Sequence, residues 1–309
     1  MTPPGVPSSV TVSAPARPVS LGLSRVTGAI ALLARRRVAL VGAVLFAVVL
    51  VVAALAPALA PWDPLVLDVK SRLRGPGPGH WLGTDDVGRD VLSRVLYGAR
   101  VSVQVGGLVV LVSVAAGLLV GLAAGYYRHL DNVLMRVMDG LMAFPAIILA
   151  IALMASLGPS LRNVIVALGV VYTPRIARIV RGSVLVVREL PYVEAAHAIG
   201  ASEVAIILRH VLPNCLSPVI VQATFIFALA VLGEAALSFL GVGAPPYVPS
   251  WGNILAEGRL YIQQAPWLTL FPGVAIMATI LGLNLFGDGL RDLLDPKLRG
   301  LSGGARSAA

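Results

Sequence analysis

Residues 193–214 read VEAAHAIGASEVAIILRHVLPN, a polar stretch in a chain of 309 residues that is 57% hydrophobic. Its polar side chains surround a glycine and precede a proline: Glu194, His197, Glu203, Arg209 and His210. Charged residues make up only 13% of the chain, against about 25% in ordinary soluble domains. Long apolar runs lie on both sides of the stretch, so its place relative to a membrane decides what it can contact.

Six apolar runs are candidate membrane spans, since a helix needs about 20 apolar residues to cross the hydrocarbon. They are residues 38–60, 101–125, 140–157, a run that begins near 163, 216–243 and 265–287. Spanning strands are not expected, because an open sheet edge cannot satisfy its backbone hydrogen bonds in lipid. The sequence therefore predicts an all-α integral membrane protein with six transmembrane helices.

The first run also has features of a signal peptide, since Ala58-Leu59-Ala60 resembles a cleavage site. Its apolar core is longer than the 7 to 15 residues or so that signal peptides use. We therefore expect an uncleaved first helix.

Basic residues set the expected topology, because cytoplasmic loops are enriched in Lys and Arg. With the N-terminus inside, sixteen of the 24 basic residues are cytoplasmic, and so are both termini and the opening stretch. The expected parts are a largely disordered cytoplasmic tail (1–37), a first transmembrane helix (38–60), an extracytoplasmic segment (61–100), a core domain with five helices (101–290) that includes a cytoplasmic loop (189–213), and a cytoplasmic tail (291–309).

Motifs for catalysis or nucleotide binding are missing from the sequence. The only lysines, Lys70 and Lys297, do not follow the glycines of a phosphate-binding loop. The four histidines and the single cysteine lack metal-ligand spacing. The net charge of +9 is spread over membrane-flanking loops, so no nucleic-acid partner is expected. We predict a non-catalytic chain without a cofactor or metal of its own.

The opening stretch is compatible with two short helices that join at Gly200 and stop at Pro213. Each helix has an apolar stripe at helical spacing: Tyr192, Ala196 and Ile199 in the first, and Val204, Ile207, Leu208 and Val211 in the second. The pattern alone leaves two interpretations open. The segment is either an amphipathic connector that lies on its own bundle or a surface on which another protein docks.

One motif in this stretch resembles a known family. Glu194-Ala195-Ala196, then Gly200, then Leu212-Pro213 match the EAA motif of permease subunits in ABC-type importers, EAA-x3-G-x9-I-x-L-P. His210 departs from the apolar residue expected there, and the neighbouring Val211 can supply the hydrophobic contact.

The resemblance extends over about residues 32–300 and points to the C-type permease of dipeptide, oligopeptide and nickel importers. Its further segments are HWLGTDDVGRDVLSRVLYGARVS, EAALSFLGVGAPPYVPSWGNILAEGR and NLFGDGLRDLLDPKLRG. It implies a type I ABC importer permease fold in the bacterial plasma (inner) membrane.

The resemblance also implies partners: a second permease, two ATPases that hold ATP and magnesium, and an extracytoplasmic substrate-binding protein. Residues 189–213 would then be the coupling loop, with Gly200 setting the bend and Glu194 offering a charge to a basic partner residue. The competing functional class is a self-sufficient secondary transporter or channel, which would need coupling groups deep in its spans.

Several residues elsewhere are candidates for a role. Glu234 is ionisable within an apolar span, and we weigh a pathway role against bridging to a neighbouring helix. Phe144-Pro145 should kink the third span and is a candidate for lining the pathway. Small-residue spacing at one helix face favours close packing within this chain, at Gly117, Gly121 and Gly125.

Two further expectations concern charged residues near the membrane surface. Arg175, Arg178 and Arg181 recur every three residues, and we expect them to snorkel to anionic headgroups, with ATPase contact as the alternative. Thr84 is expected to cap a helix whose first turn contains Asp85 and Asp86.

Overall fold

The computed structural model describes residues 37–294, so most of the two predicted terminal tails lies outside the described residues. The described part is built of helices and contains no strand, only two isolated β-bridges. The long helices are α2 (Arg37–Leu59), α3 (Val91–Tyr126), α6 (Leu161–Val187), α9 (Leu212–Phe239) and α11 (Trp267–Leu294). The shorter elements are η1 (Val69–Ser71), α4 (Arg128–Met142), α5 (Ala146–Leu157), α7 (Pro191–Ala198), α8 (Glu203–Ile206), η2 (Ile207–Val211), α10 (Trp251–Gly258) and η3 (Arg259–Tyr261).

Five helical stretches are long and apolar enough to cross a membrane, and the count becomes six if α4 and α5 form one span. These two helices meet at an angle of 93°, at the expected Phe144-Pro145 break. Proline has no N–H to donate and disfavours helical geometry in the residue before it, so the chain turns at this point.

Helix α3 begins at Val91, well before the apolar run that starts at residue 101. Asp90 caps it by accepting a hydrogen bond from the Ser93 amide at 2.8 Å. Thr84 is therefore not the cap that the sequence suggested. Its hydroxyl bonds the carbonyl of Ser71 and accepts from the Arg74 amide at 2.8 Å, because the chain from 84 to 90 forms a turn and not a helix.

The centre of the bundle is the contact between α3 and α6, with α9 packed on both. Gly117, Gly121 and Gly125 lie on the face of α3 that meets α6. A Cβ atom at Gly121 would lie 2.6 Å from the Ala177 carbonyl oxygen, and one at Gly125 would lie 2.6 Å from Cβ of Val184. These glycines therefore pack inside this chain and let the two helices approach closely.

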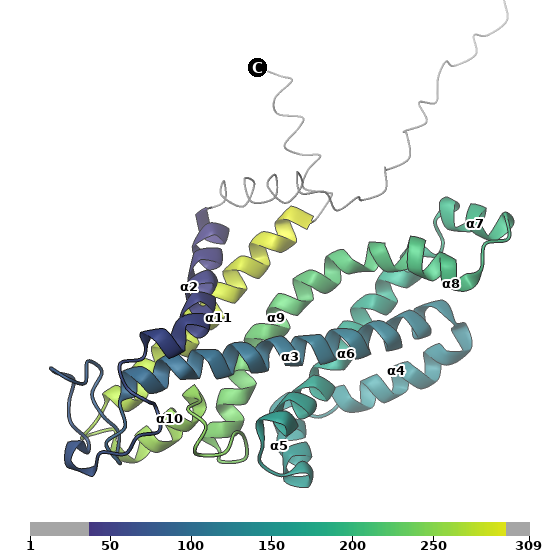
Figure 1. Cartoon of the computed structure of the whole chain (residues 1–309). Coiled ribbons are helices and arrows are strands. Elements are labelled where there is room, and N and C mark those ends of the chain that lie inside the picture. Colours follow the sequence, from purple (N-terminus) through teal and green to yellow (C-terminus); the bar gives the residue numbers. More distant parts are fainter. Residues whose placement is uncertain (1–36, 295–309) are drawn as a thin grey trace, which may run out of the picture.

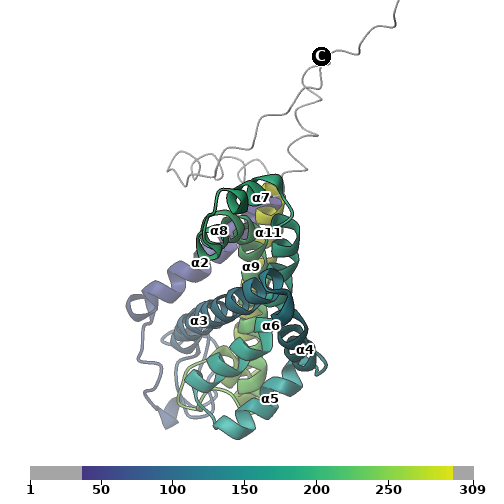
Figure 2. The same cartoon turned by 90° about the vertical axis from the view of Figure 1, so that its right-hand side faces the viewer.

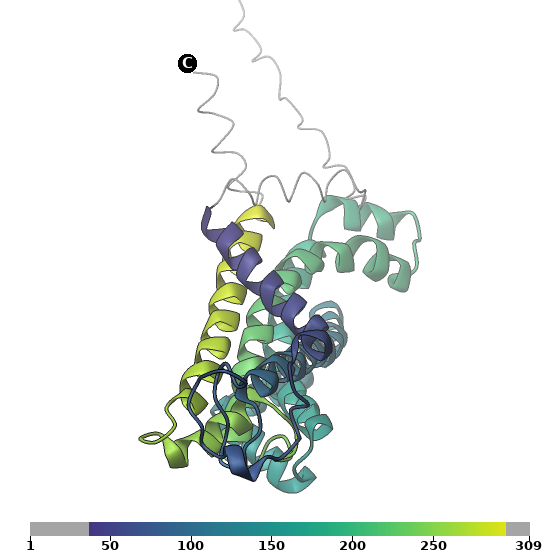
Figure 3. The ribbon, with the colours of Figure 1, turned by 60° about the vertical axis from the view of Figure 1, so that its left-hand side comes forward.

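Different helices and loops lie at the two ends of the bundle (Figure 1). The start of α2, the end of α11 and the pair α7 and α8 lie towards one end. Residues 60–90, α5 and α10 lie towards the other end, and Figures 2 and 3 show the same arrangement from other sides. We call the first the coupling end and the second the outer end, after the role and the orientation that the sequence leads us to expect for them.

Buried ion pairs tie the outer end together. Arg94 is 1% exposed and binds Asp85 at 2.6 Å and Glu257 of α10, which links the start of α3 to a helix far along the chain. Arg89 bridges the same two carboxylates at 2.6 and 2.9 Å. Burial lowers the pKa of Arg89, but the charges of Glu257 and Asp85 outweigh burial and raise it above its ordinary value. The network therefore keeps its charges paired.

Candidate functional site

The candidate site is the segment between α6 and α9, residues 189–213, which we call the coupling segment after the role expected for it. It projects from the bundle as two short helices (Figures 1 and 3). Helix α7 begins at Pro191, shortly after α6 ends at Val187, and α8 continues through η2 into α9. The predicted pair of helices joined at a glycine is confirmed. The predicted stop at Pro213 is wrong, because η2 leads without a break into α9 and Pro213 lies in the first turn of α9, where proline is tolerated. Because both ends of the pair lead into long helices, a force on this segment is passed directly to α6 and α9.

Gly200 ends α7 in a left-handed conformation, with φ of +79°. The Ala201 amide bonds the Ala196 carbonyl at 3.1 Å, and the Gly200 amide bonds the His197 carbonyl at 2.9 Å. These two bonds form a Schellman motif, which favours glycine because other residues are strained at positive φ. A Cβ atom at Gly200 would meet no atom within 4 Å. Glycine is therefore required here for its backbone conformation, not for space.

Helix α8 is capped by Ser202, whose hydroxyl accepts from the Ala205 amide at 3.4 Å. It runs into η2, a π-helical turn of five residues, in which the Leu212 amide bonds the Ile207 carbonyl. Proline at 213 has no amide hydrogen and would clash with the carbonyl four residues earlier in a regular α-helix. The wider turn accommodates this proline, and such turns are frequent at functional sites.

A few buried side chains anchor the segment to the bundle. Val193, Ala196, Ile206 and Val211 belong to the main hydrophobic core and are at most 7% exposed. The His197 ring lies 3.2 Å from the Tyr126 hydroxyl at the end of α3. The segment is thus held in place by one face only.

The predicted apolar stripes are wrong in part. Ile199 is 84% exposed, Val204 is 63% exposed and Leu208 is 56% exposed, although all three were expected to share stripes with buried residues. The core instead takes Val193 and Ile206, each one position away from an expected stripe residue, together with Ala196 and Val211, which were expected to be buried. Three large apolar side chains therefore face outward on a polar segment.

Some residues of the EAA motif are exposed and others face the bundle. Glu194 and Ala195 are exposed, whereas Ala196 is buried, Leu212 is half-buried and Pro213 is exposed. Within the described chain, Glu194 makes no ion pair or side-chain hydrogen bond. Its carboxylate is available to another molecule.

A hollow of about 510 Å³ lies at the base of the segment, between it and the turn that joins α3 to α4. Its lining includes both charge signs: Tyr126, Tyr127, Arg128, His129, Arg188, Glu189, His197 and Glu203. The sequence alone did not indicate this hollow, because its residues come from three separate parts of the chain.

The structure places the other candidate residues away from the coupling segment. Glu234 is fully buried and its Oε1 accepts from the Ser238 hydroxyl at 2.8 Å, one turn further along α9. Phe144 is 59% exposed at the break between α4 and α5, where Pro145 is exposed as well. Neither position faces the coupling segment.

Two of the three arginines of α6 that we expect to snorkel have acidic partners within the chain. Arg181 forms two bonds to Asp131, at 2.5 and 2.6 Å, and Arg178 binds Asp139 at 2.8 Å. Both carboxylates belong to α4, which lies beside α6 and places one acid next to each of these two arginines. Arg175 forms neither of these pairs.

Three carboxylates at the outer end lie as close together as the ligands of a cation, but arginines already neutralise two of them. Asp85, Asp86 and Glu257 bring oxygens within 4.8 Å of one another. Asp85 and Glu257 already bind Arg89 and Arg94, so their negative charge is compensated within the chain.

Two protein-family descriptions match parts of this sequence. Residues 113–300 match the family described as binding-protein-dependent transport system inner membrane component. Residues 27–76 match the N-terminal TM domain of oligopeptide transport permease C.

The relatives are permease proteins of bacteria. A permease protein of Brucella suis biovar 1 (strain 1330), whose name refers to a peptide transport system, is 54% identical over 267 residues, covering 86% of this chain and 90% of the relative. The dipeptide transport system permease protein of Alkalihalophilus pseudofirmus is 46% identical over 268 residues, 86% of this chain and 88% of that protein.

Among solved structures, a chain of an amino acid ABC transporter with histidines overlaps 68% of this chain and 94% of its own length. The TM-score is 0.48 and the identity 16%. The family match and the relatives establish that this chain belongs to the binding-protein-dependent inner membrane components, the permeases of ABC importers, and within them to the C-type permeases of the peptide-transport group.

Proposed function

We propose that this chain is one of two permease subunits that form the membrane pathway of an ATP-driven peptide importer, and that residues 189–213 couple it to separate ATPases. In this proposal α4 and α5 form one span, which gives six. The protein lies in the bacterial inner membrane with both termini in the cytoplasm, and an extracytoplasmic binding protein delivers the substrate. ATP and magnesium are bound by the ATPases. The names of the relatives support peptides as the cargo.

The observation that carries the coupling role is the outward face of α7 and α8. An amphipathic connector that lay on its own bundle would bury its large apolar side chains, yet Ile199, Val204 and Leu208 are more than half exposed. Glu194, on the same segment, is exposed and forms no ion pair or side-chain hydrogen bond within the described chain. An apolar surface with one free carboxylate suits a partner cleft with a basic residue, and burying those side chains would contribute about 1.5–3 kcal/mol each.

The arrangement of the termini supports the orientation. The start of α2 and the end of α11 lie at the coupling end with α7 and α8 (Figure 1), which supports placing all of them on the same side of a membrane. Cytoplasmic ATPases would approach from that side.

The test is ATP-driven uptake by the complete importer in proteoliposomes. Glu194→Lys reverses the exposed charge and Gly200→Arg adds a long side chain at a position of positive φ, and we expect both to abolish uptake while the complex still reaches the membrane. Glu194→Asp keeps the carboxylate and should retain most of the uptake. Normal uptake by the Glu194→Lys variant would refute the coupling role.

Liposomes that contain this chain alone test the competing class. Substrate flux through them without ATPases would indicate a secondary transporter or channel. A stable complex that contains two ATPase chains, with no flux through the isolated chain, supports the importer.

A further inference from the structure

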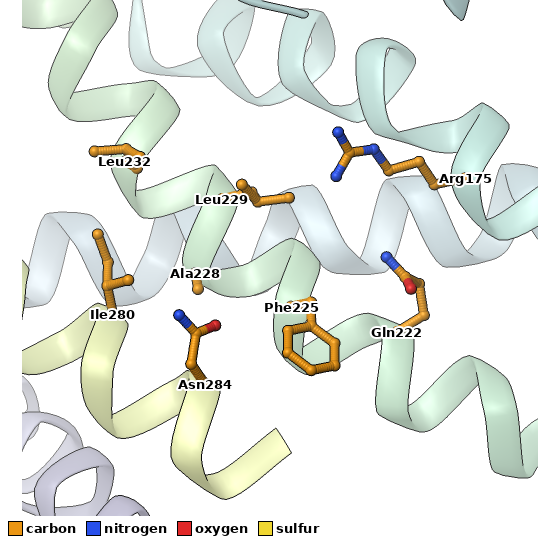
Figure 4. A pocket seen from close by; sticks show the side chains of 8 residues that line it. All are labelled: Arg175, Gln222, Phe225, Ala228, Leu229, Leu232, Ile280 and Asn284. Atoms are coloured by element: carbon orange, nitrogen blue, oxygen red, sulfur yellow. The ribbon is translucent and has the colours of Figure 1, made fainter. Parts of the chain in front are cut away.

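A second hollow, of about 340 Å³, lies between α6, α9 and α11, within the part of the bundle expected to lie in the membrane. Its lining combines polar and apolar side chains (Figure 4): Arg175, Gln222, Phe225, Ala228, Leu229, Leu232, Ile280 and Asn284. The volume lies at the lower end of the range for small-molecule sites. The hollow is separate from the coupling segment and from Glu234.

Arg175 is the unusual member of this group. It lies near the middle of α6, roughly 20 Å along the helix from either end. Its guanidinium stacks over the Tyr172 ring at 5.7 Å, and no carboxylate in residues 37–294 pairs with it. The nearby Arg178 and Arg181 both have acidic partners on α4. A charge at this depth without a counter-charge marks a substrate pathway more often than a packing contact.

Two side-chain amides line the same hollow as Arg175 and add further hydrogen-bond donors. The side chains of Gln222 and Asn284 come from different helices, and neither forms a hydrogen bond within the described chain (Figure 4). A guanidinium can only donate hydrogen bonds, and each amide adds an NH₂ group. The hollow therefore offers donors and positive charge, which is the chemistry that binds an anionic oxygen group.

The apolar part of the lining restricts what kind of anion fits. The donors are surrounded by apolar side chains, which can contact many kinds of peptide side chain because apolar contacts have no preferred direction. These are Phe225, Leu229, Leu232 and Ile280. A carboxylate attached to a variable, partly apolar body matches both halves of the hollow. Every unmodified peptide has such a group at its C-terminus, ionised at neutral pH.

We propose that Arg175, with Gln222 and Asn284, binds the C-terminal carboxylate of the peptide as it passes through the membrane. The inference rests on the proposed function, since it requires peptide cargo. The site selects for the terminal carboxylate and accepts different side chains. A second permease opposite α6, α9 and α11 would close the open side of the hollow.

Uptake by the complete importer in proteoliposomes, with L-alanyl-L-alanine as the probe, tests the role of Arg175. Arg175→Met removes the charge and keeps most of the side-chain volume. We expect uptake to fall roughly tenfold or more, as for the loss of a hydrogen bond to a charged group. Stimulation of the ATPase by the loaded binding protein should stay within about twofold, because the coupling segment is unchanged.

Arg178→Met is the matched control, one turn along the same helix, where the ion pair with Asp139 is exposed and contributes little. It should retain both uptake and ATPase stimulation. Normal uptake by Arg175→Met overturns the proposal. Loss of both readings in Arg175→Met also overturns it, since Arg175 would then support packing or coupling.

A binding measurement keeps the proposal testable if Arg175→Met fails to assemble. Leu232 lines the hollow and is 48% exposed, so Leu232→Cys in a Cys215→Ala background places one thiol there. We expect saturating L-alanyl-L-alanine to slow its modification by a water-soluble maleimide several-fold, and the C-terminal amide of the same dipeptide to leave it unchanged. Equal effects of the two probes, or none, contradict a carboxylate site.

Failure of this site and failure of the proposed function give different results. If the wild-type complex takes up no peptide and its ATPase ignores the loaded binding protein, the importer assignment is wrong. If wild-type uptake is robust and the variants behave like wild type, only the carboxylate site is wrong.

Discussion

The outer end and the coupling end of this protein use polar residues in opposite ways. At the outer end, Arg94, Asp85 and Glu257 are paired with one another and Arg94 is almost fully buried. At the coupling end, Glu194 is exposed without a partner in residues 37–294, and Ile199 and Leu208 face outward. The first end satisfies its own charges and surfaces, whereas the second leaves them for another molecule. Stability and assembly should therefore respond to different substitutions.

The largest expected effect is on stability, from Arg94→Met at the outer end. Among the described residues it leaves Arg89 as the one arginine paired with Asp85 and Glu257, and breaking a buried ionic network in this way costs about 3–5 kcal/mol. Thermal unfolding of the purified complex should show a clear drop in Tm. Arg100→Met, at an exposed position on the same helix, is the control and should change Tm little. Equal Tm values for the two variants would mean that the network does not hold this end together.

The reverse pattern is expected for Leu208→Ser at the coupling end. Since Leu208 is 56% exposed, its loss should change the free energy of unfolding by less than about 0.5 kcal/mol. The affinity of the permease pair for the ATPases should fall roughly tenfold, measured by titration of complexes in nanodiscs. Reduced stability with unchanged affinity would show that the residue packs on its own bundle.

A glycine-to-alanine substitution made once at each end distinguishes the cost of steric crowding from the cost of backbone strain. Gly98→Ala brings a Cβ atom to 2.5 Å from Cδ1 of the buried Trp251, whose indole N–H donates to the Val95 carbonyl at 2.9 Å. Displacing this ring should cost about 1–3 kcal/mol. Gly200→Ala meets no neighbour and should cost about 1 kcal/mol from its positive φ alone.

Hydrogen exchange distinguishes the two glycine variants. Gly98→Ala should increase exchange across the start of α3 and α10, whereas the effect of Gly200→Ala should stay within α7 and α8. A global increase in exchange from Gly200→Ala would contradict the view that the coupling segment is held by one face only.

The smallest effect concerns Asp86, which lies beside the outer network and forms no ion pair with an arginine of the described part of the chain. Burial, with the neighbouring charges of Asp85 and Glu257, raises the pKa of Asp86 above its ordinary value of 3.8. Such an acid holds its proton more tightly in the folded state, so its contribution to stability is greatest below pH 3.8 and is lost as the pH rises through the raised pKa. Asp86→Asn should therefore raise Tm slightly at pH 7 and not at pH 3.5. A lower Tm at pH 7 would mean that the carboxylate makes a favourable contact.

Much of the fold follows from the sequence because the bilayer imposes strong constraints. The apolar runs, the break at Phe144-Pro145 and the helix pair around Gly200 all depend on local properties, namely length, proline and glycine. The predicted cap at Thr84 is wrong because contacts with Ser71 and Arg74 hold Thr84 in a turn, and the helix begins only after Asp90.

The site divides in the same way. The spacing of Glu194, Gly200 and Pro213 is a local pattern, and the sequence alone was sufficient to single out this segment. The faces that α7 and α8 expose depend on which side of each helix packs on the main core, and periodicity alone offered a neighbouring side as well.

What the sequence by itself determined is the class of molecule: a helical membrane protein with a polar loop whose motif belongs to ABC permeases. Hydrophobic length and local spacing are written directly in the order of residues. Only the tertiary structure decided which charges are paired. Arg181 and Arg175 have the same chemistry on the same helix, yet one meets Asp131 of α4 and the other faces the hollow with Gln222 and Asn284. The partner of a charge is set by helices that pack across the bundle, and that packing is not encoded at any one position.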